Sequence, residues 1–169
     1  HNLSECCDAI CAYIDNPAIT VEELMQHIKG PDFPTGGIIQ GYQGIKDAFE
    51  TGRGRIVIRS KTDIEVSESG RETIVVTEIP YMVNKREMIE KIAELVETKK
   101  VEGIAYINDE TTMKGVRIVI RLKKDANSNA VLNMLYKYSP LQSSFSVNNV
   151  ALVGGRPRTL NLKQLIKYF

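Results

Sequence analysis

Residues 55–79 read RIVIRSKTDIEVSESGRETIVVTEI and hold two strand-forming stretches on either side of a short polar loop. β-Branched residues are frequent in both stretches, and Gly70 in the loop gives the backbone the freedom that a tight reversal needs. Two such runs joined by a short glycine-containing loop are typical of a β-hairpin. The sequence therefore predicts antiparallel strands at residues 55–66 and 72–79, with Pro80 ending the second strand.

Helices alternate with further strands after this hairpin. Asn84 is followed by Glu87 in the order of a helix cap, and apolar residues then recur at intervals of three and four. Since hairpins prevent an all-parallel sheet, we expect an α+β fold with helices packed on one face of an antiparallel sheet. The predicted elements are a helix from residue 84, a hairpin of residues 103–107 and 116–123, a helix at 128–138 and a strand at 142–153.

Three short helices are predicted ahead of the first hairpin. The first begins at Asn2 or Ser4 and reaches Ile14, the second covers residues 21–28 after a Thr20 cap, and the third covers 45–50. Residues 29–37 carry two prolines and three glycines, which predicts an irregular connector. At the other end, residues 154–157 predict a turn and a helix begins near Leu160. The expected order is ααα-ββαββαβ-α.

Composition excludes several classes of protein. The 169 residues include 22 lysines and arginines against 21 aspartates and glutamates, so net charge alone favours neither nucleic acid nor membrane. No apolar run approaches the roughly 20 residues that span a bilayer. The chain opens without an initiator methionine or a signal peptide, which suggests a fragment of a cytoplasmic protein.

The cysteines fit a reducing cytoplasm. Cys6, Cys7 and Cys11 form an odd, crowded set, which is a poor disulfide framework. His1 and His27 stand far apart in the sequence and in no ligand-pair pattern, so no zinc site is predicted. We expect buried or half-buried thiols.

A local row of basic residues lies along the first predicted strand. Alternate strand residues share a face, so Arg55, Arg59 and Lys61 line one side and stand about 7 Å apart. Arg53 precedes them in a Gly-Arg-Gly loop, where small neighbours would let a phosphate approach the backbone. Spacing alone favours the plainer interpretation, the solvent face of an antiparallel sheet. If the row does bind DNA, it reads the backbone with little base specificity.

The other sequence patterns support no functional assignment. The letters RIVIR recur at residues 117–121, followed by Lys123 and Lys124, with no role assigned. The glycine-rich pieces lack the lysine ending of a nucleotide-binding P-loop, and Asp109 and Glu110 are typical turn residues. Neither histidine has an evident acid partner. The sequence therefore predicts no catalytic, metal-binding or cofactor-binding residue in this chain.

Four segments resemble a known family. They are HNLSE at residues 1–5, KGPDFPT at 29–35, TGRGR at 51–55, and EIPY at 78–81 followed by VNK at 83–85. In this order they resemble the A subunit of bacterial type IIA topoisomerases, DNA gyrase above all, with topoisomerase IV as the close alternative. The resemblance covers essentially the whole chain.

This resemblance implies that the chain is one part of a larger, multi-subunit enzyme. The chain would be the tower domain, residues 1–159, followed at 160–169 by the start of a coiled-coil helix. The whole enzyme would be an A2B2 assembly that cuts one duplex and passes another through it, gyrase adding negative supercoils with ATP. The nucleophilic tyrosine would precede this chain, and Mg²⁺ and ATP would belong to the B subunit, so this fragment alone would be inactive.

The resemblance also changes the interpretation of the basic row. In the family the tower supports bent DNA beside the cleavage site, which favours Arg53, Arg55, Arg59 and Lys61 as phosphate contacts. The alternative is a structural scaffold that binds the B subunit or a second A subunit, with Arg156 and the terminal helix at those contacts. An independent small-molecule enzyme has the least support, because no convergent acid, base or nucleophile is found.

Overall fold

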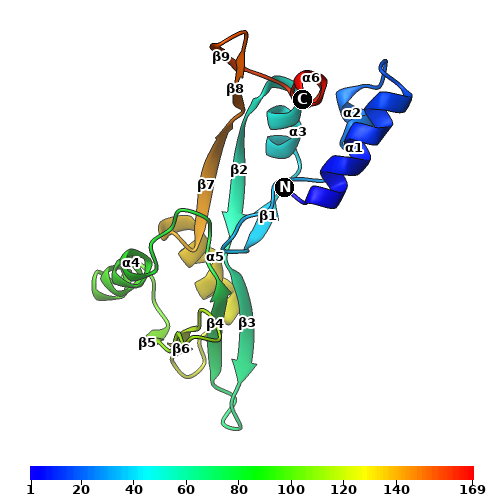
Figure 1. Ribbon diagram of the computed structural model, residues 1–169. Helices are drawn as coiled ribbons and strands as arrows, with labels where there is room; N and C mark the ends of the chain where they lie inside the picture. The colour runs from blue at the N-terminus through cyan, green and yellow to red at the C-terminus, as the bar shows by residue number, and fades with distance from the viewer. The chain divides into compact units, whose positions relative to one another are not determined.

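A computed structural model describes residues 1–169, and the chain forms two compact units (Figure 1). Unit 1 contains His1–Phe33, Ile39–Val57 and Ser144–Phe169, and unit 2 contains Pro34–Ile38 and Ile58–Ser143. Helices and antiparallel strands alternate, which confirms the predicted α+β class. No helix of the chain combines the length and the apolar character needed to cross a membrane.

Unit 2 is built on a four-stranded antiparallel sheet in the order β3-β4-β6-β5. The predicted hairpins are present as β3 (Lys61–Val66) with β4 (Glu72–Glu78) and β5 (Ile104–Asp109) with β6 (Ile118–Leu122). Ile74 pairs with Ile120 and Val76 with Ile118 across β4 and β6. Because alternate strand residues share a face, this register places one continuous apolar surface on one side of the sheet.

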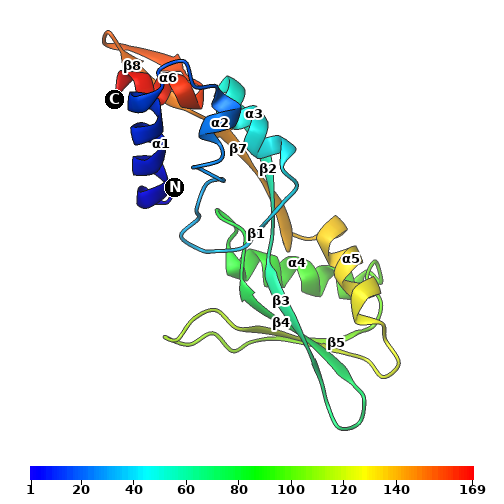
Figure 2. The ribbon, with the colours of Figure 1, turned by 90° about the vertical axis from the view of Figure 1, so that its right-hand side faces the viewer.

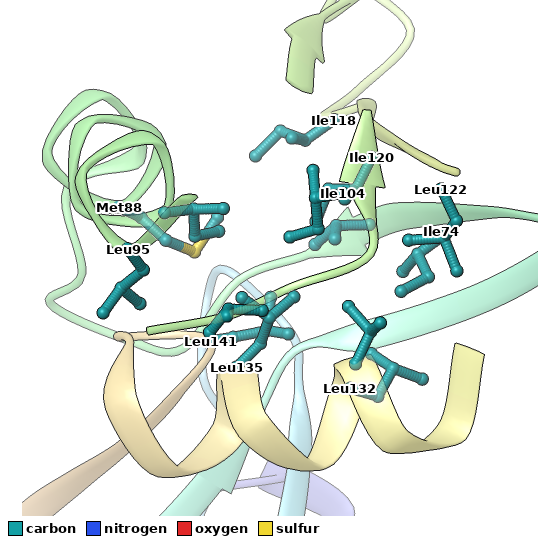
Figure 3. Close-up of a cluster of buried hydrophobic side chains, with 14 of the residues drawn as sticks. Ile74, Met88, Leu95, Ile104, Ile118, Ile120, Leu122, Leu132, Leu135 and Leu141 are labelled. Carbon is teal, nitrogen blue, oxygen red and sulfur yellow. The ribbon is translucent and has the colours of Figure 1, made fainter. Parts of the chain in front are cut away.

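Two helices cover that surface (Figure 2). They are α4 (Lys85–Glu97), capped by Asn84 as predicted, and α5 (Ser128–Tyr138). Met88 and Leu95 of α4 and Leu132 and Leu135 of α5 point toward the strands and pack with Ile74, Ile104, Ile118, Ile120 and Leu122 (Figure 3). Full burial of each such side chain stabilises the fold by about 1.5–3 kcal/mol, so this cluster forms the hydrophobic core of unit 2.

A surface ion pair joins α4 to β5. The Lys85 ammonium hydrogen-bonds the Asp109 carboxylate at 2.8 Å, and with the hydrogen bonds from Thr111 it holds the pKa of Asp109 at about 2 instead of 3.8. The charged carboxylate therefore stabilises the fold fully above about pH 4, and this contribution is lost as the pH falls to about 2. Both side chains are partly exposed, so solvent keeps the contribution small.

Replacement of Lys85 by methionine is expected to raise the pKa of Asp109 toward its ordinary value, because it removes the largest cause of the shift. The side-chain carboxyl ¹³C shift of Asp109, followed by NMR between pH 5 and about 1.5, measures this pKa directly. The exposed Lys114→Met is the matched control and should leave that pKa unchanged. An equal Asp109 midpoint in wild type and Lys85→Met would disprove the role given to this ion pair.

Unit 1 gathers the short helices from both ends of the chain. They are α1 (Leu3–Asp15), α2 (Val21–Leu24), α3 (Gln43–Thr51) and α6 (Leu162–Tyr168). Asn2 and Thr20 cap the first two helices as predicted, and Asn161 forms a capping box with Gln164 at the start of α6. A three-stranded sheet has the order β1-β2-β7, and β8 pairs with β9 in a separate hairpin.

Two predicted strands are broken. Residues 55–66 form β2 (Arg53–Arg59) and β3, which belong to different sheets and meet at Ser60. The Ser60 N–H donates to Leu141 O at 2.9 Å, and its buried hydroxyl has no hydrogen-bond partner. Residues 142–153 likewise form β7 (Gln142–Asn148) and β8 (Val150–Val153), separated at Asn149, whose N–H donates to Gly52 O. Distant backbone partners cause both breaks.

Other expectations need smaller corrections. The turn predicted at residues 154–157 covers only Gly154 and Gly155, because Arg156 and Pro157 begin β9 (Arg156–Thr159). The second helix ends at Leu24, four residues early, and β1 (Ile38–Gln40) was not predicted. Cys6 is half-buried and its thiol is free, as expected, whereas Cys7 and Cys11 are exposed. They lie on α1, whose only fully buried residue is Ala9, and they line an apolar groove together with residues of α6.

Candidate nucleic-acid interface

The turn between α3 and β2 positions the first two predicted DNA contacts. Helix α3 ends at Thr51 and is capped by Gly52. The positive φ of Gly52, 81°, is one that glycine adopts without strain, and its N–H donates to Ala48 O at 2.9 Å. The hydroxyl oxygen of Thr51 accepts the Arg53 N–H at 3.2 Å. These hydrogen bonds end the helix and start the strand within two residues, so they fix the backbone conformation at Arg53.

Two glycines then let the helix and the strand touch. A side chain on Gly44 of α3 would overlap the carbonyl oxygen of Arg55, and one on Gly54 would lie 2.8 Å from the Ala48 nitrogen. The backbones of α3 and β2 are therefore in direct contact, closer than any other residue type permits. Because the helix occupies one side of the Arg53–Gly54–Arg55 segment, Arg53 and Arg55 are exposed on the remaining side.

Arg53 and Arg55 are available for a ligand. Both are exposed, and neither guanidinium forms an ion pair or a hydrogen bond within the chain. Ile56 is only 2% exposed and Ile58 only 1%, so the predicted alternation of basic and buried residues along β2 is confirmed. Both arginines belong to unit 1.

Arg59 and Lys61 belong to unit 2 and differ from the first pair. The Arg59 Nε donates to Gln142 Oε1 at 2.7 Å, and its guanidinium carbon lies 4.4 Å from the centre of the Tyr136 ring. These contacts fix the group in one orientation and leave its terminal nitrogens without a partner in the chain. Lys61 is exposed beyond the break at Ser60.

One arginine of the second basic strand is neutralised by two acids, and the other is half-buried. Arg117 pairs with Glu65 at 3.6 Å and with Glu110 at 3.1 Å. Arg121 lies half-buried on β6, opposite Thr73 of β4. The repeated RIVIR letters therefore do not repeat the environment of Arg53 and Arg55.

The family-like segments also have structural roles in unit 2. Glu78 ends β4 and accepts the Gly37 N–H at 2.7 Å, while a side chain on Gly36 would lie 2.5 Å from the Glu78 carboxyl carbon. The carboxylate thus holds the glycine pair that follows the KGPDFPT segment. Neither Gly44 nor this use of Glu78 could be found from spacing, because each depends on a residue distant in the sequence.

Comparison with known protein sequences identifies the family of the chain. A family model for the A subunit of DNA gyrase and topoisomerase IV matches residues 1–169. The chain belongs to this family. Its relatives include the DNA gyrase A subunits of Clostridium acetobutylicum, 54% identical over 169 residues, and Ureaplasma parvum, 55% identical over 169 residues. The DNA topoisomerase 4 A subunit of Staphylococcus epidermidis is 53% identical over 169 residues.

These alignments cover all of this chain but only 20%, 20% and 21% of the three relatives. The chain therefore spans about a fifth of the length of the subunits it matches. Identity to the gyrase and topoisomerase IV proteins is nearly equal, so membership in the A-subunit family that the two enzymes share is the level at which the chain is identified. No group of three or more metal-ligating side chains is present in the chain.

Proposed function

We propose that this chain positions duplex DNA within the A subunit of a type IIA topoisomerase, by holding the phosphate backbone. The observation that carries the proposal is the pair of exposed, unpartnered arginines at the start of β2, Arg53 and Arg55, held by the contact of α3 with β2. A guanidinium binds phosphate with strong, often bidentate hydrogen bonds. Arg59 and Lys61 would add contacts from unit 2.

The proposed contacts read the backbone, not the bases. The two arginines stand about 7 Å apart along the strand, comparable to the distance between neighbouring phosphates on one DNA strand. No aromatic side chain lies between them on β2, so the strand offers no surface on which unpaired bases could stack. We therefore expect duplex binding with little preference for sequence.

The activity of the whole enzyme is part of this proposal. As an A2B2 assembly, the full-length protein would pass one duplex through another, and gyrase would use ATP to add negative supercoils. The catalytic tyrosine would lie elsewhere in the A subunit, and Mg²⁺ and ATP would bind the B subunit. This chain would contribute position, without chemistry of its own, in the bacterial cytoplasm.

A salt titration of DNA binding tests the proposal. In the full-length, assembled enzyme, Arg53→Gln/Arg55→Gln should reduce the slope of log K against log salt by about 4, because the two A subunits together lose four phosphate contacts and each contributes about 0.9. Duplexes of equal length and different sequence should show the same change. A slope identical to that of the wild-type assembly would refute the proposed contacts.

A second candidate function is a scaffold that binds the other subunits. Leu3 and Ile14 on α1 are 78% and 69% exposed, and α1, α3 and α6 of unit 1 enclose an apolar groove of about 670 Å³. Exposed apolar surface of this kind marks contacts with other polypeptides. In that case the arginine variants would leave both DNA binding and supercoiling intact, and changes at Leu3 and Ile14 would weaken assembly of the enzyme.

A further inference from the structure

Charge is distributed unevenly along the chain. The final segment of unit 1, Ser144–Phe169, contains Arg156, Arg158, Lys163 and Lys167 and no aspartate or glutamate. Four cations against no acids give this segment a formal charge of +4, although the whole chain carries only +1. A segment whose charged side chains are all positive creates a local positive field, even though the chain as a whole is nearly neutral.

The β8–β9 hairpin presents the two arginines of this segment on one side. Arg156 pairs with Val153 and Arg158 with Ala151, and directly paired residues point to the same side of a ribbon. Gly154 and Gly155 form the turn with positive φ values of 58° and 76°, as a two-residue hairpin turn requires. Both arginines are exposed, and neither guanidinium forms an ion pair or a hydrogen bond in the chain.

The base of the hairpin is fixed beside the Arg53 turn. Asn149, just before β8, donates its N–H to Gly52 O at 2.8 Å and accepts the Leu160 N–H at 2.9 Å. A side chain on Gly52 would lie 2.8 Å from the Cγ2 of Thr159 and would overlap the Leu160 carbonyl. Gly52 and Thr159 are therefore in close contact within unit 1. Arg53 follows Gly52 in the sequence and Arg158 precedes Thr159, so the two arginines flank this contact. The chain brings them together although more than 100 residues separate them.

We infer that the β8–β9 hairpin is a second element that holds the same duplex, with Arg156 and Arg158 binding its phosphates next to those bound at Arg53. The inference rests on the proposed function of Arg53 and Arg55. Arg156 and Arg158 stand about 7 Å apart on one strand, which suits neighbouring phosphates. A two-stranded ribbon also has the width that the major groove of DNA admits. Neither arginine has a carboxylate in its own segment, so both guanidinium groups are free to bind a polyanion whose charges repeat at this spacing.

The test uses the salt titration of the full-length, assembled enzyme on a duplex. Arg156→Gln/Arg158→Gln removes four phosphate contacts from the two A subunits, so it should lower the slope of log K against log salt by about 4 and weaken binding about tenfold at low salt. Lys99→Gln/Lys114→Gln removes two exposed cations of unit 2 as the matched control and should leave both quantities unchanged. Thermal unfolding and sedimentation of each variant confirm that it folds and that the enzyme assembles.

The outcomes distinguish the proposed function of Arg53 and Arg55 from the inference about the β8–β9 hairpin. If Arg53→Gln/Arg55→Gln lowers the slope and the hairpin variant does not, the hairpin inference is overturned and the proposed function stands. If neither variant lowers it, both are overturned. A hairpin variant that dissociates the enzyme while its DNA slope stays at the wild-type value would show that the hairpin binds protein, which also overturns the inference.

Discussion

Exchange of both Arg53 and Arg55 for glutamate is expected to weaken duplex binding by the full-length, assembled enzyme by about 100-fold at 0.1 M salt. In each A subunit the exchange removes two phosphate contacts and places two carboxylates against the DNA, where like charges repel. Both side chains are exposed and unpartnered, so the fold should be unaffected. ATP-dependent supercoiling or relaxation, followed by gel electrophoresis of plasmid DNA, should fall with the affinity.

The matched control is Lys99→Glu/Lys114→Glu, which changes the total charge equally at two exposed positions of unit 2. It should retain wild-type affinity and activity. Equal losses in the two double variants would mean that binding responds only to net charge, and the role assigned to Arg53 and Arg55 would fail. Full activity of Arg53→Glu/Arg55→Glu would favour the scaffold function instead.

Replacement of Gly44 by alanine is expected to destabilise unit 1 by about 3 kcal/mol, the upper part of the range for overpacked positions. Helix propensity alone predicts the opposite, since alanine favours a helix interior by about 1 kcal/mol over glycine. Packing decides the sign here, because the added methyl group would overlap the Arg55 backbone, which cannot rotate away as a side chain does. The variant should also separate α3 from β2 and so displace Arg55.

Urea denaturation measures this effect, and Gly30→Ala provides the control. A methyl group at Gly30 meets only the terminal Cδ1 of Ile45, at 3.1 Å, and a flexible side chain can move away. Gly30→Ala should therefore change the free energy of unfolding far less than Gly44→Ala. If Gly44→Ala is as stable as wild type, the close contact of α3 with β2 does not exist in the protein.

Local sequence signals predicted most of the elements. Asn84 and Thr20 cap helices because their side chains accept backbone N–H groups two or three residues on, which spacing reveals. The breaks at Ser60 and Asn149 could not be predicted in this way. Ser60 bonds Leu141 and Asn149 bonds Gly52, so each break depends on a partner about 80 or more residues away.

The candidate interface was predicted in part. Alternation along β2 separated exposed Arg53 and Arg55 from buried Ile56 and Ile58, because that pattern is local. The contact of Arg59 with Gln142 and Tyr136 is not local, and neither is the approach of the β8–β9 hairpin to Gly52. The absence of acids after residue 125 is visible in the sequence and could have drawn attention to Arg156 and Arg158.

The most direct test of the central claim is a structure of the full-length, assembled enzyme bound to a duplex, at a resolution that shows arginine side chains. We predict that the guanidinium groups of Arg53 and Arg55 each lie within about 3 Å of a phosphate oxygen. Guanidinium groups that point into bulk solvent, or that another subunit covers, would contradict the claim that this chain holds DNA through them.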